Sequence, residues 1–281
     1  MNAPQQRSFT PAGPFRIDEI GPGVRIQTLY PGGKAGPNNE TANEIPGGQN
    51  WAEIVMLGSE EDDFIMAIPD IRMPANQFWP MHWHDCWTVV VALEGNCQVG
   101  DWYMQPGDVF IASPSIEYGP LFPGPKGTRI LEIFADLALS PGGYGPEYRD
   151  HPTLIGGPHV FKQREGINRR NEGHSMLPVD GAEGMWKSRL APGWSWDLGD
   201  PADPQRSIVR YVELAEREKI AAKQRGDWYG ALILGGSGEI AGRAVGTDDV
   251  VVAERDAAVP DLVAGKGGLK VLEHFRTSLA L

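Results

Sequence analysis

The sequence of 281 residues contains only two cysteines, Cys86 and Cys97. Two cysteines cannot form the several disulfides that hold small secreted domains together, so we exclude a disulfide scaffold and expect a reduced, cytoplasmic protein. No apolar run approaches the roughly 20 residues of a membrane-spanning helix, and we therefore expect no membrane association. Residues 1–15 also lack the basic start and the apolar centre of a secretory signal.

Basic residues are in the minority. Lysine and arginine number 25 against 37 acidic residues, which gives a formal net charge of −12. Because no basic stripe is present to neutralise phosphates, we expect no nucleic-acid partner.

Glycine and proline, in contrast, are abundant, with 36 and 24 residues respectively. They are spread between short apolar runs, a pattern typical of many turns that join many strands. The sequence therefore predicts an all-β fold.

The chain divides into four regions. Residues 1–50 are rich in turn formers and are expected to form an N-terminal arm, and residues 51–136 are predicted to form the first β-module, which carries the metal site proposed below. Residues 137–185 are irregular and are expected to act as a linker to a second β-rich module, residues 186–281.

One segment of the second module, residues 204–226, departs from this pattern. Its apolar residues stand at helical spacing among charges and good helix formers, and Gly226 follows the last turn. We therefore predict a single amphipathic helix with the apolar residues Ile208, Tyr211, Val212, Leu214 and Ile220.

The two modules repeat each other at an offset of 141 residues. Residues 92–95 (ALEG) match residues 233–236 (ILGG), and residues 131–134 (LEIF) match residues 272–275 (LEHF). A self-match at fixed offset indicates two copies of one structural unit, in which the predicted helix looks like an insertion in the second copy.

The first copy carries a pair of histidines one residue apart. In a strand, residues i and i+2 face the same way, so His82 and His84 are expected to project from one face. Thr88 and Val90 share their parity. An isolated pair of this kind is often no more than two surface imidazoles, so its context decides its meaning.

That context resembles the cupin superfamily, whose members are small double-stranded β-helix (jelly-roll) barrels with a metal inside. His82, His84 and Gly95 match the first cupin motif, and residues 106–108 (PGD) match the second. The resemblance implies two cupin barrels in tandem, a bicupin with one inserted helix.

The ligand pattern departs from that of the family at two positions. Thr88 stands where cupins usually have a glutamate, and Glu117 stands where they usually have a histidine. The resemblance then implies His82, His84 and Glu117 as ligands of one divalent metal ion per chain. We favour Fe(II), since two imidazoles and a carboxylate are the ligand types of the facial triad, and leave zinc, manganese and nickel open. The alternative is a barrel that has lost its metal.

The second copy lacks these ligands. At the same offset His82, His84 and Glu117 correspond to Lys223, Arg225 and Ala258, so we expect the second barrel to be degenerate and structural.

Other residues near the predicted metal complete the hypothesis. Glu117 and Tyr118 are candidate catalytic residues, as acid, base or anchor. The substrate pocket is predicted to be lined by the tryptophans at the strand ends and by residues that share the parity of the histidines, although the tryptophans are equally expected as barrel packing: Trp79, Trp87, Thr88 and Val90.

Three functions remain open. The first is a non-haem Fe(II) dioxygenase that cleaves a C–C bond of a small aromatic or β-diketone-type compound with O₂. The second is a non-redox metal-dependent isomerase, lyase or decarboxylase, and the third is a ligand-binding cupin without catalysis. Each has a small molecule as its partner. We also expect a homo-oligomer, because the arm and the metal-free barrel both offer surfaces.

Overall fold

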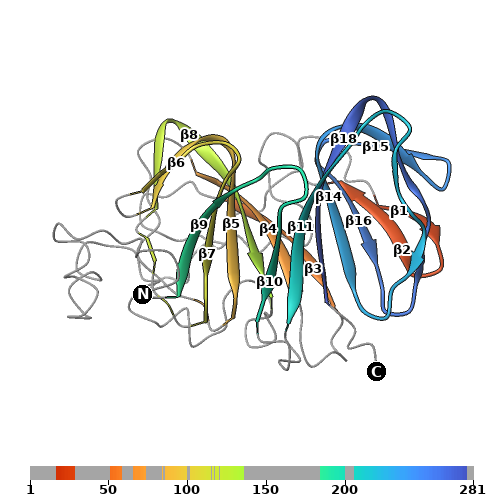
Figure 1. Cartoon of the computed structure of the whole chain (residues 1–281), viewed down its shortest axis with the longest axis horizontal. Helices are drawn as coiled ribbons and strands as arrows, with labels where there is room; N and C mark the ends of the chain where they lie inside the picture. Colours follow the sequence, from red (N-terminus) through yellow and green to blue (C-terminus); the bar gives the residue numbers. More distant parts are fainter. Residues whose placement is uncertain are drawn as a thin grey trace, which may run out of the picture.

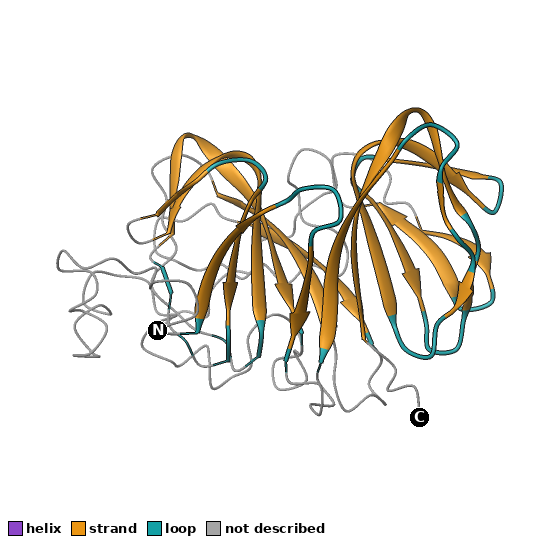
Figure 2. Cartoon of the chain, in the orientation of Figure 1, coloured by secondary structure: helices purple, strands orange, loops and turns teal. Residues whose placement is uncertain are grey.

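A computed structural model shows which of these expectations the chain fulfils. Every regular element that it describes is a β-strand, eighteen in all (Figure 2), which confirms the all-β class. No described segment forms a helix long and apolar enough to cross a membrane. The structure describes residues 17–28, 51–58, 66–73, 84, 86–99, 102–114, 116, 118–119, 121–135, 184–199 and 206–276.

The first module is a curled antiparallel sheet with the strand order β3-β4-β8-β5-β7-β9, in which β6 pairs with β5. The strands are β3 (Trp51–Leu57), β4 (Met66–Met73), β5 (Thr88–Val99), β6 (Trp102–Met104), β7 (Asp108–Ala112), β8 (Leu121–Phe134) and β9 (Met185–Arg189).

The second module has the strand order β1-β2-β16-β14-β18-β11-β10, with β12 paired to β18 and β15 to β14, and a separate two-stranded sheet of β13 and β17. The strands are β1 (Ile17–Gly21), β2 (Val24–Thr28), β10 (Ser195–Leu198), β11 (Ser207–Leu214), β12 (Lys219–Ile220), β13 (Lys223–Gln224), β14 (Tyr229–Ile240), β15 (Arg243–Gly246), β16 (Asp249–Ala253), β17 (Ala258–Val259) and β18 (Leu262–Arg276).

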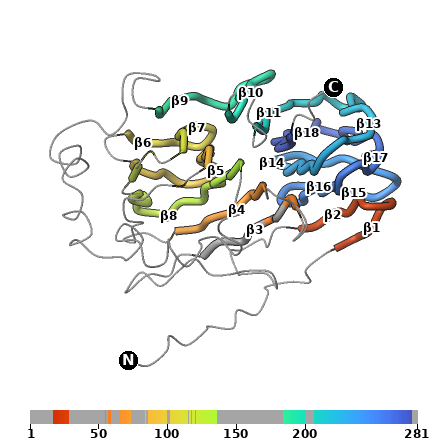
Figure 3. The backbone as a smooth tube through the Cα atoms, turned by 90° about the horizontal axis from the view of Figure 1, so that it is seen from below, coloured from red at the N-terminus to blue at the C-terminus, as the bar shows by residue number. Residues whose placement is uncertain are grey.

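The modules lie side by side, and each takes a strand from the other half of the chain (Figures 1 and 3). Strand β2, near the N-terminus, pairs antiparallel with β16 of the second module, and the Thr28 hydroxyl donates a hydrogen bond to Asp249 at 2.7 Å. Strand β9, which follows the predicted linker, pairs with β7 of the first module. Each sheet therefore contains at least one strand from the half of the chain that forms most of the other sheet.

The structural repeat follows the sequence offset closely. Strand β5 begins at Thr88 and β14 at Tyr229, which is 141 residues later, and β7 and β16 stand in the same relation. Gly95 and Gly236 both have positive φ angles, of 65° and 85°, and a Cβ at either would strike the carbonyl oxygen of a facing glycine. The two modules therefore have the same internal construction.

The helix predicted at residues 204–226 is wrong: the described part of this segment, residues 206–226, contains strands β11, β12 and β13. Along β11, buried Ser207, Val209 and Tyr211 alternate with partly exposed residues, which is the period of a strand. All eight residues of β11 also pair with β18. The β-branched and aromatic residues thus gain a sheet partner that outweighs local helix propensity.

The charged part of this segment is a turn rather than a helical face. The backbone amide of Glu218 donates to the Ala215 carbonyl at 3.0 Å, and the Ala215 amide donates to the Glu218 carboxylate at 2.7 Å. Arg217 has a φ of 67°, which no helix accepts. Since β4 (Met66–Met73) and β11 (Ser207–Leu214) also keep the 141-residue offset, β11 belongs to the repeat and is no insertion.

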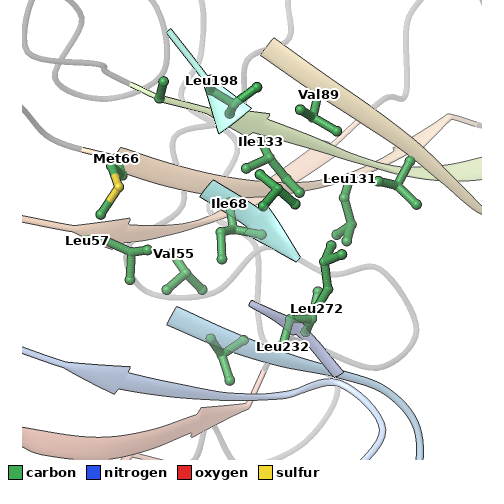
Figure 4. Packing of buried hydrophobic residues seen from close by; sticks show 14 of the residues in the cluster. Val55, Leu57, Met66, Ile68, Val89, Leu131, Ile133, Leu198, Leu232 and Leu272 are labelled. Atoms are coloured by element: carbon green, nitrogen blue, oxygen red, sulfur yellow. The ribbon is translucent and has the colours of Figure 1, made fainter. Parts of the chain in front are cut away.

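The three largest apolar clusters of the described residues hold the fold together. Each module has its own interior core, and a third core lies between the two sheets (Figure 4). In this shared core Leu57 and Ile68 of the first module press so closely on Gly230 of the second that a Cβ there would meet Leu57 at 2.8 Å. The residues of the shared core labelled in Figure 4 are Val55, Leu57, Met66, Ile68, Val89, Leu131, Ile133, Leu198, Leu232 and Leu272.

A buried arginine adds a polar link between the modules. Arg129 of β8 donates to both carboxylate oxygens of Asp70, at 2.8 and 3.0 Å, and to Asp248 of the second module at 2.5 Å. Burial raises the pKa of Asp70, and the Arg129 charge opposes that rise. The guanidinium therefore compensates acids from both modules at once.

Candidate functional site

The interior of the first module gathers three polar side chains that come from separate segments. His84 lies just before β5, Tyr118 precedes β8, and Glu132 projects from β8 opposite Val90 of β5. All three are nearly inaccessible to solvent, with 5%, 0% and 2% exposure. We refer to them as the His84–Tyr118–Glu132 cluster.

Glu132 is the centre of this cluster. The Nε2 atom of His84 lies 3.4 Å from Oε1 of Glu132, and the Tyr118 hydroxyl donates a short hydrogen bond to the same oxygen. Because a buried carboxylate is costly unless it is paired, both contacts stabilise Glu132 in the barrel.

Aromatic rings hold the members of the cluster in place. The imidazole of His84 packs on Phe134, with ring centroids 4.3 Å apart, and Tyr118 meets the edge of Phe110 at 4.9 Å. Phe134 and Glu132 lie on the same face of β8, so one strand supplies both the carboxylate and the ring that orients the histidine.

The pKa of the Cys97 thiol reflects the apolar and negatively charged surroundings in this interior. Burial, and then the negative charge of Glu132, raise the pKa of Cys97 to about 12. A thiol must lose its proton to become a good metal ligand, so this environment disfavours Cys97 in that role. Cys86 is also buried, and the two cysteines form no disulfide with each other.

Among the sequence-predicted site residues, the structure brings His84 and Tyr118 together on either side of Glu132. Val90 belongs to the same interior apolar core as Tyr118, and Thr88 is buried with its hydroxyl 3.4 Å from the Cys86 carbonyl. The remaining predicted residues that lie outside the described part of the chain are His82, Glu117 and Trp79.

Trp87 is placed elsewhere. Its indole stacks on Trp186 of β9, with ring centroids 5.6 Å apart, and packs against the core shared by the two modules. Trp186 in turn contacts Trp196 at 5.7 Å. Trp87 thus belongs to a row of tryptophans along the junction between the modules, which matches the packing role left open above.

Glu132 was missed by the sequence reasoning, although a signal for it was present. It is the lone carboxylate in the apolar stretch 130–134, and the repeat carries a second one, Glu273, at the same offset. An acid in the middle of a buried strand, present in both copies, indicates a polar centre inside each barrel.

The second module shows what replaces the histidine. Arg225 stands at the position equivalent to His84, and its Nη2 atom lies 3.6 Å from Oε1 of Glu273. The Tyr229 hydroxyl donates to that same oxygen at 2.8 Å. The second module therefore keeps a carboxylate and a phenol but has a guanidinium where the first has an imidazole.

The chemistry of the first-module cluster fits a divalent cation. Two donors bound to one ion at about 2.1 Å stand roughly 3.0–3.4 Å apart, depending on the angle between them, and His84 and Glu132 are 3.4 Å apart. Within the described ranges, no three histidine, cysteine or acidic side chains gather into a complete metal site. A further ligand would have to come from elsewhere, and the predicted ligands His82 and Glu117 lie outside those ranges.

Comparison with known proteins identifies the architecture. No family model matches the chain, and no curated protein matches its sequence. The fold is similar to that of the protein Ylba from E. coli, with a TM-score of 0.55 and 11% identity over 96% of this chain and 97% of the other. It is also similar to an R92A mutant of the Bacillus subtilis oxalate decarboxylase OxdC, with a TM-score of 0.50 and 16% identity over 86% and 76%. At such identities the likeness shows a common fold.

Proposed function

We propose that this chain is a bicupin, with two cupin modules in tandem, and an enzyme whose first module holds a catalytic divalent metal ion. The observation that carries this proposal is the buried imidazole of His84 beside the buried carboxylate of Glu132. The second module, with Arg225 in place of His84, is not part of this proposed metal site.

We propose His84 and Glu132 as ligands from the described part of the chain, joined by His82 and Glu117 as the sequence predicts. Imidazole and carboxylate donors suit iron, manganese, nickel and zinc alike, and we favour Fe(II). When bound, the ion would supply Lewis acidity and, in the case of iron, activation of O₂.

The protein's own side chains contribute a proton donor and an apolar lining around the cluster. The Tyr118 hydroxyl donates a hydrogen bond to Glu132 Oε1. From this position the hydroxyl could donate a hydrogen bond to a substrate oxygen or exchange a proton with it. Val90, Phe110 and Ile130 surround the cluster with apolar surface, which excludes water and strengthens these polar contacts. We therefore propose Tyr118 in the catalytic role predicted from the sequence.

For the reaction we propose an oxidoreductase that uses O₂ to cleave a C–C bond of a small aromatic or β-diketone-type compound. The contact between Tyr118 and Glu132 also favours a second candidate, a non-redox isomerase, lyase or decarboxylase, because a phenol–carboxylate pair is suited to moving protons. A cupin that binds its ligand without turnover is the third outcome.

Metal analysis of the purified protein tests the proposed site. We expect about one ion per chain in the wild type and a loss of most of that metal in His84→Ala and in Glu132→Gln. Glu239→Gln, which removes an exposed carboxylate, is the matched control and should retain the metal. Full metal content in both cluster variants would refute the site.

Oxygen uptake separates the reaction classes. The protein reconstituted anaerobically with Fe(II) is mixed with a panel of β-diketones and phenolic compounds and then exposed to air. Uptake that requires both substrate and His84 supports the dioxygenase. Turnover of a substrate without O₂ uptake, with zinc or manganese bound, supports the non-redox alternative.

The homo-oligomer and the cytoplasmic location remain part of the proposal. The buried Cys86 and Cys97 form no disulfide with each other, which is compatible with a reducing compartment. Light scattering of the eluting protein gives the oligomeric state directly, and a mass of one chain would contradict the expected assembly.

A further inference from the structure

The buried acid of the second module is already fully engaged. Glu273 is completely inaccessible, and its Oε2 atom accepts from Arg210, with Nε at 2.7 Å and Nη2 at 2.5 Å. Its Oε1 atom accepts from the Tyr229 hydroxyl at 2.8 Å. Glu273 therefore has its counter-charge without Arg225.

Arg225 is left with a charge that has no hydrogen-bond acceptor in the described part of the chain. Its side chain is 10% exposed, its Nε atom is buried without a partner, and its 3.6 Å separation from Glu273 is too long for a hydrogen bond. The remaining contacts of its guanidinium are with rings: Tyr229 at 4.1 Å and Phe275 at 5.4 Å. A buried guanidinium in this state favours an anion that would supply the missing acceptors.

The balance of charges around Glu273 also favours a bound anion. Two guanidiniums, of Arg210 and Arg225, face one carboxylate, which leaves one positive charge. The nearest acid along the chain, Asp227, instead pairs with Arg255 at 3.8 Å and with a second arginine, Arg276, at 4.0 Å.

The aromatic ring of Phe275 indicates which class of anion would fit beside these arginines. The Phe275 ring is near both guanidiniums, 5.4 Å from that of Arg225 and 5.7 Å from that of Arg210, and Arg210 is 41% exposed. A ligand that reached Arg225 past Arg210 would set its charged end on the guanidiniums and its body against Phe275. A flat apolar body would suit this wall.

We propose that the second module binds a small aromatic carboxylate, held by Arg225 and Arg210 and packed against Phe275. Charge-assisted hydrogen bonds from a guanidinium to a carboxylate are strong and directional, so the pair would define the orientation of the ligand. The site is separate from the His84–Tyr118–Glu132 cluster and does not rest on the function proposed for the first module.

Calorimetric titration of the full chain with benzoate tests this proposal. We expect saturable binding of one benzoate per chain, tighter than that of acetate, which lacks the ring. Arg225→Gln should weaken benzoate binding about tenfold or more, because it removes a charged donor. Arg217→Gln is the matched control, since Arg217 is an arginine with an 89% exposed side chain on a nearby turn, and should bind as the wild type does.

Several results would overturn the proposal. They are no saturable benzoate binding by the wild type, equal weakening in Arg225→Gln and Arg217→Gln, or loss of benzoate binding in Glu132→Gln, which would place the ligand in the first module. Urea unfolding of Arg225→Gln shows whether the variant is folded. If it is not, Arg225→Lys, which keeps the charge but loses the planar donor fork, should bind benzoate more weakly than the wild type, and unchanged binding there would also refute the site.

Discussion

At the scale of single residues, the position held by His84 in the first module and Arg225 in the second is the most informative difference between them. His84 and Arg225 both lie next to a buried glutamate that also accepts a hydrogen bond from a tyrosine. A neutral imidazole has a lone pair with which it can bind a cation beside the carboxylate, whereas a guanidinium is always protonated and has none. This difference is consistent with the metal that we propose for the first module and the anion that we propose for the second.

A second histidine has a different role. His274 is completely buried on the face of β18 that meets the first module, and its Nε2 atom lies 3.0 Å from the Ser207 hydroxyl. Burial, and then the charge of Arg276, lower the pKa of His274 to about 3. In the unfolded chain its pKa is near 6.5, so between these values the unfolded chain binds more protons than the folded one. The stability that neutral His274 contributes is therefore complete above pH 6.5 and is lost as the pH falls toward 3.

This titration predicts the pH dependence of a variant. His274→Gln cannot be protonated, so it removes this contribution to the slope of stability against pH. Between pH 7 and pH 5 the free energy of unfolding of the wild type should fall relative to that of the variant by about 2 kcal/mol. Urea titrations of both proteins at several pH values measure the difference, and parallel curves would contradict the assignment.

At the scale of elements, tight glycine contacts pin strand registers in both modules. Gly236 of β14 has a φ of 85°, and a Cβ there would strike the backbone carbonyl of Gly268 in β18. Gly95 and Gly127 repeat this arrangement in the first module. Backbone cannot yield as a flexible side chain does, so these positions require glycine for two separate reasons: conformation and space.

A pair of alanine substitutions separates the two reasons. Gly242 has a φ of 74° but has nothing within 4 Å of its would-be Cβ. Gly242→Ala should therefore cost only the strain of a left-handed residue, about 1 kcal/mol, and Gly236→Ala should cost at least about 2 kcal/mol more. Denaturant unfolding measures both, and equal losses would show that the clash relaxes.

The elements also show what sequence patterns can and cannot predict. The repeat, the glycine turns and the parity of Val90 were visible because each depends on local periodicity. The helix prediction for residues 204–226 failed because residues 215–223 favour a helix by local propensity. The structure of the segment is instead decided by β18, a strand distant in sequence with which β11 and β12 pair. Glu132 was overlooked because its partners, His84 and Tyr118, lie 48 and 14 residues away and only the fold brings them together.

At the scale of the whole molecule, the exchange of strands joins the modules more firmly than a linker would. Strand β2 lies in the sheet of the second module although the whole first module separates them in sequence. Its Val24 and Ile26 side chains are fully buried in the second-module core. No periodicity in the sequence could have predicted this pairing, because nothing local in residues 24–28 specifies which edge they join.

Substitutions in the N-terminal hairpin of β1 and β2 test whether this hairpin is an integral part of the second-module core. Ile26→Ala should destabilise the protein by about 2–5 kcal/mol, as expected for a large-to-small change at a fully buried site. Ile17→Ala, in β1, changes the same residue type where it is 47% exposed and should cost less than about 0.5 kcal/mol. Equal small effects in thermal or urea unfolding would show that β2 is not integral to the second module.

The pairing of β2 with β16 also has a consequence for how the polypeptide is made. Thr28 and Asp249 are 221 positions apart, and a ribosome adding 5–20 residues per second needs roughly 10–45 s to pass from one to the other. During that interval β2 can pair with β1 in the N-terminal hairpin, but the edge of β2 that later meets β16 is open to neighbouring nascent chains. We therefore expect this open edge of β2 to be a site of aggregation for the nascent chain until β16 has been synthesised.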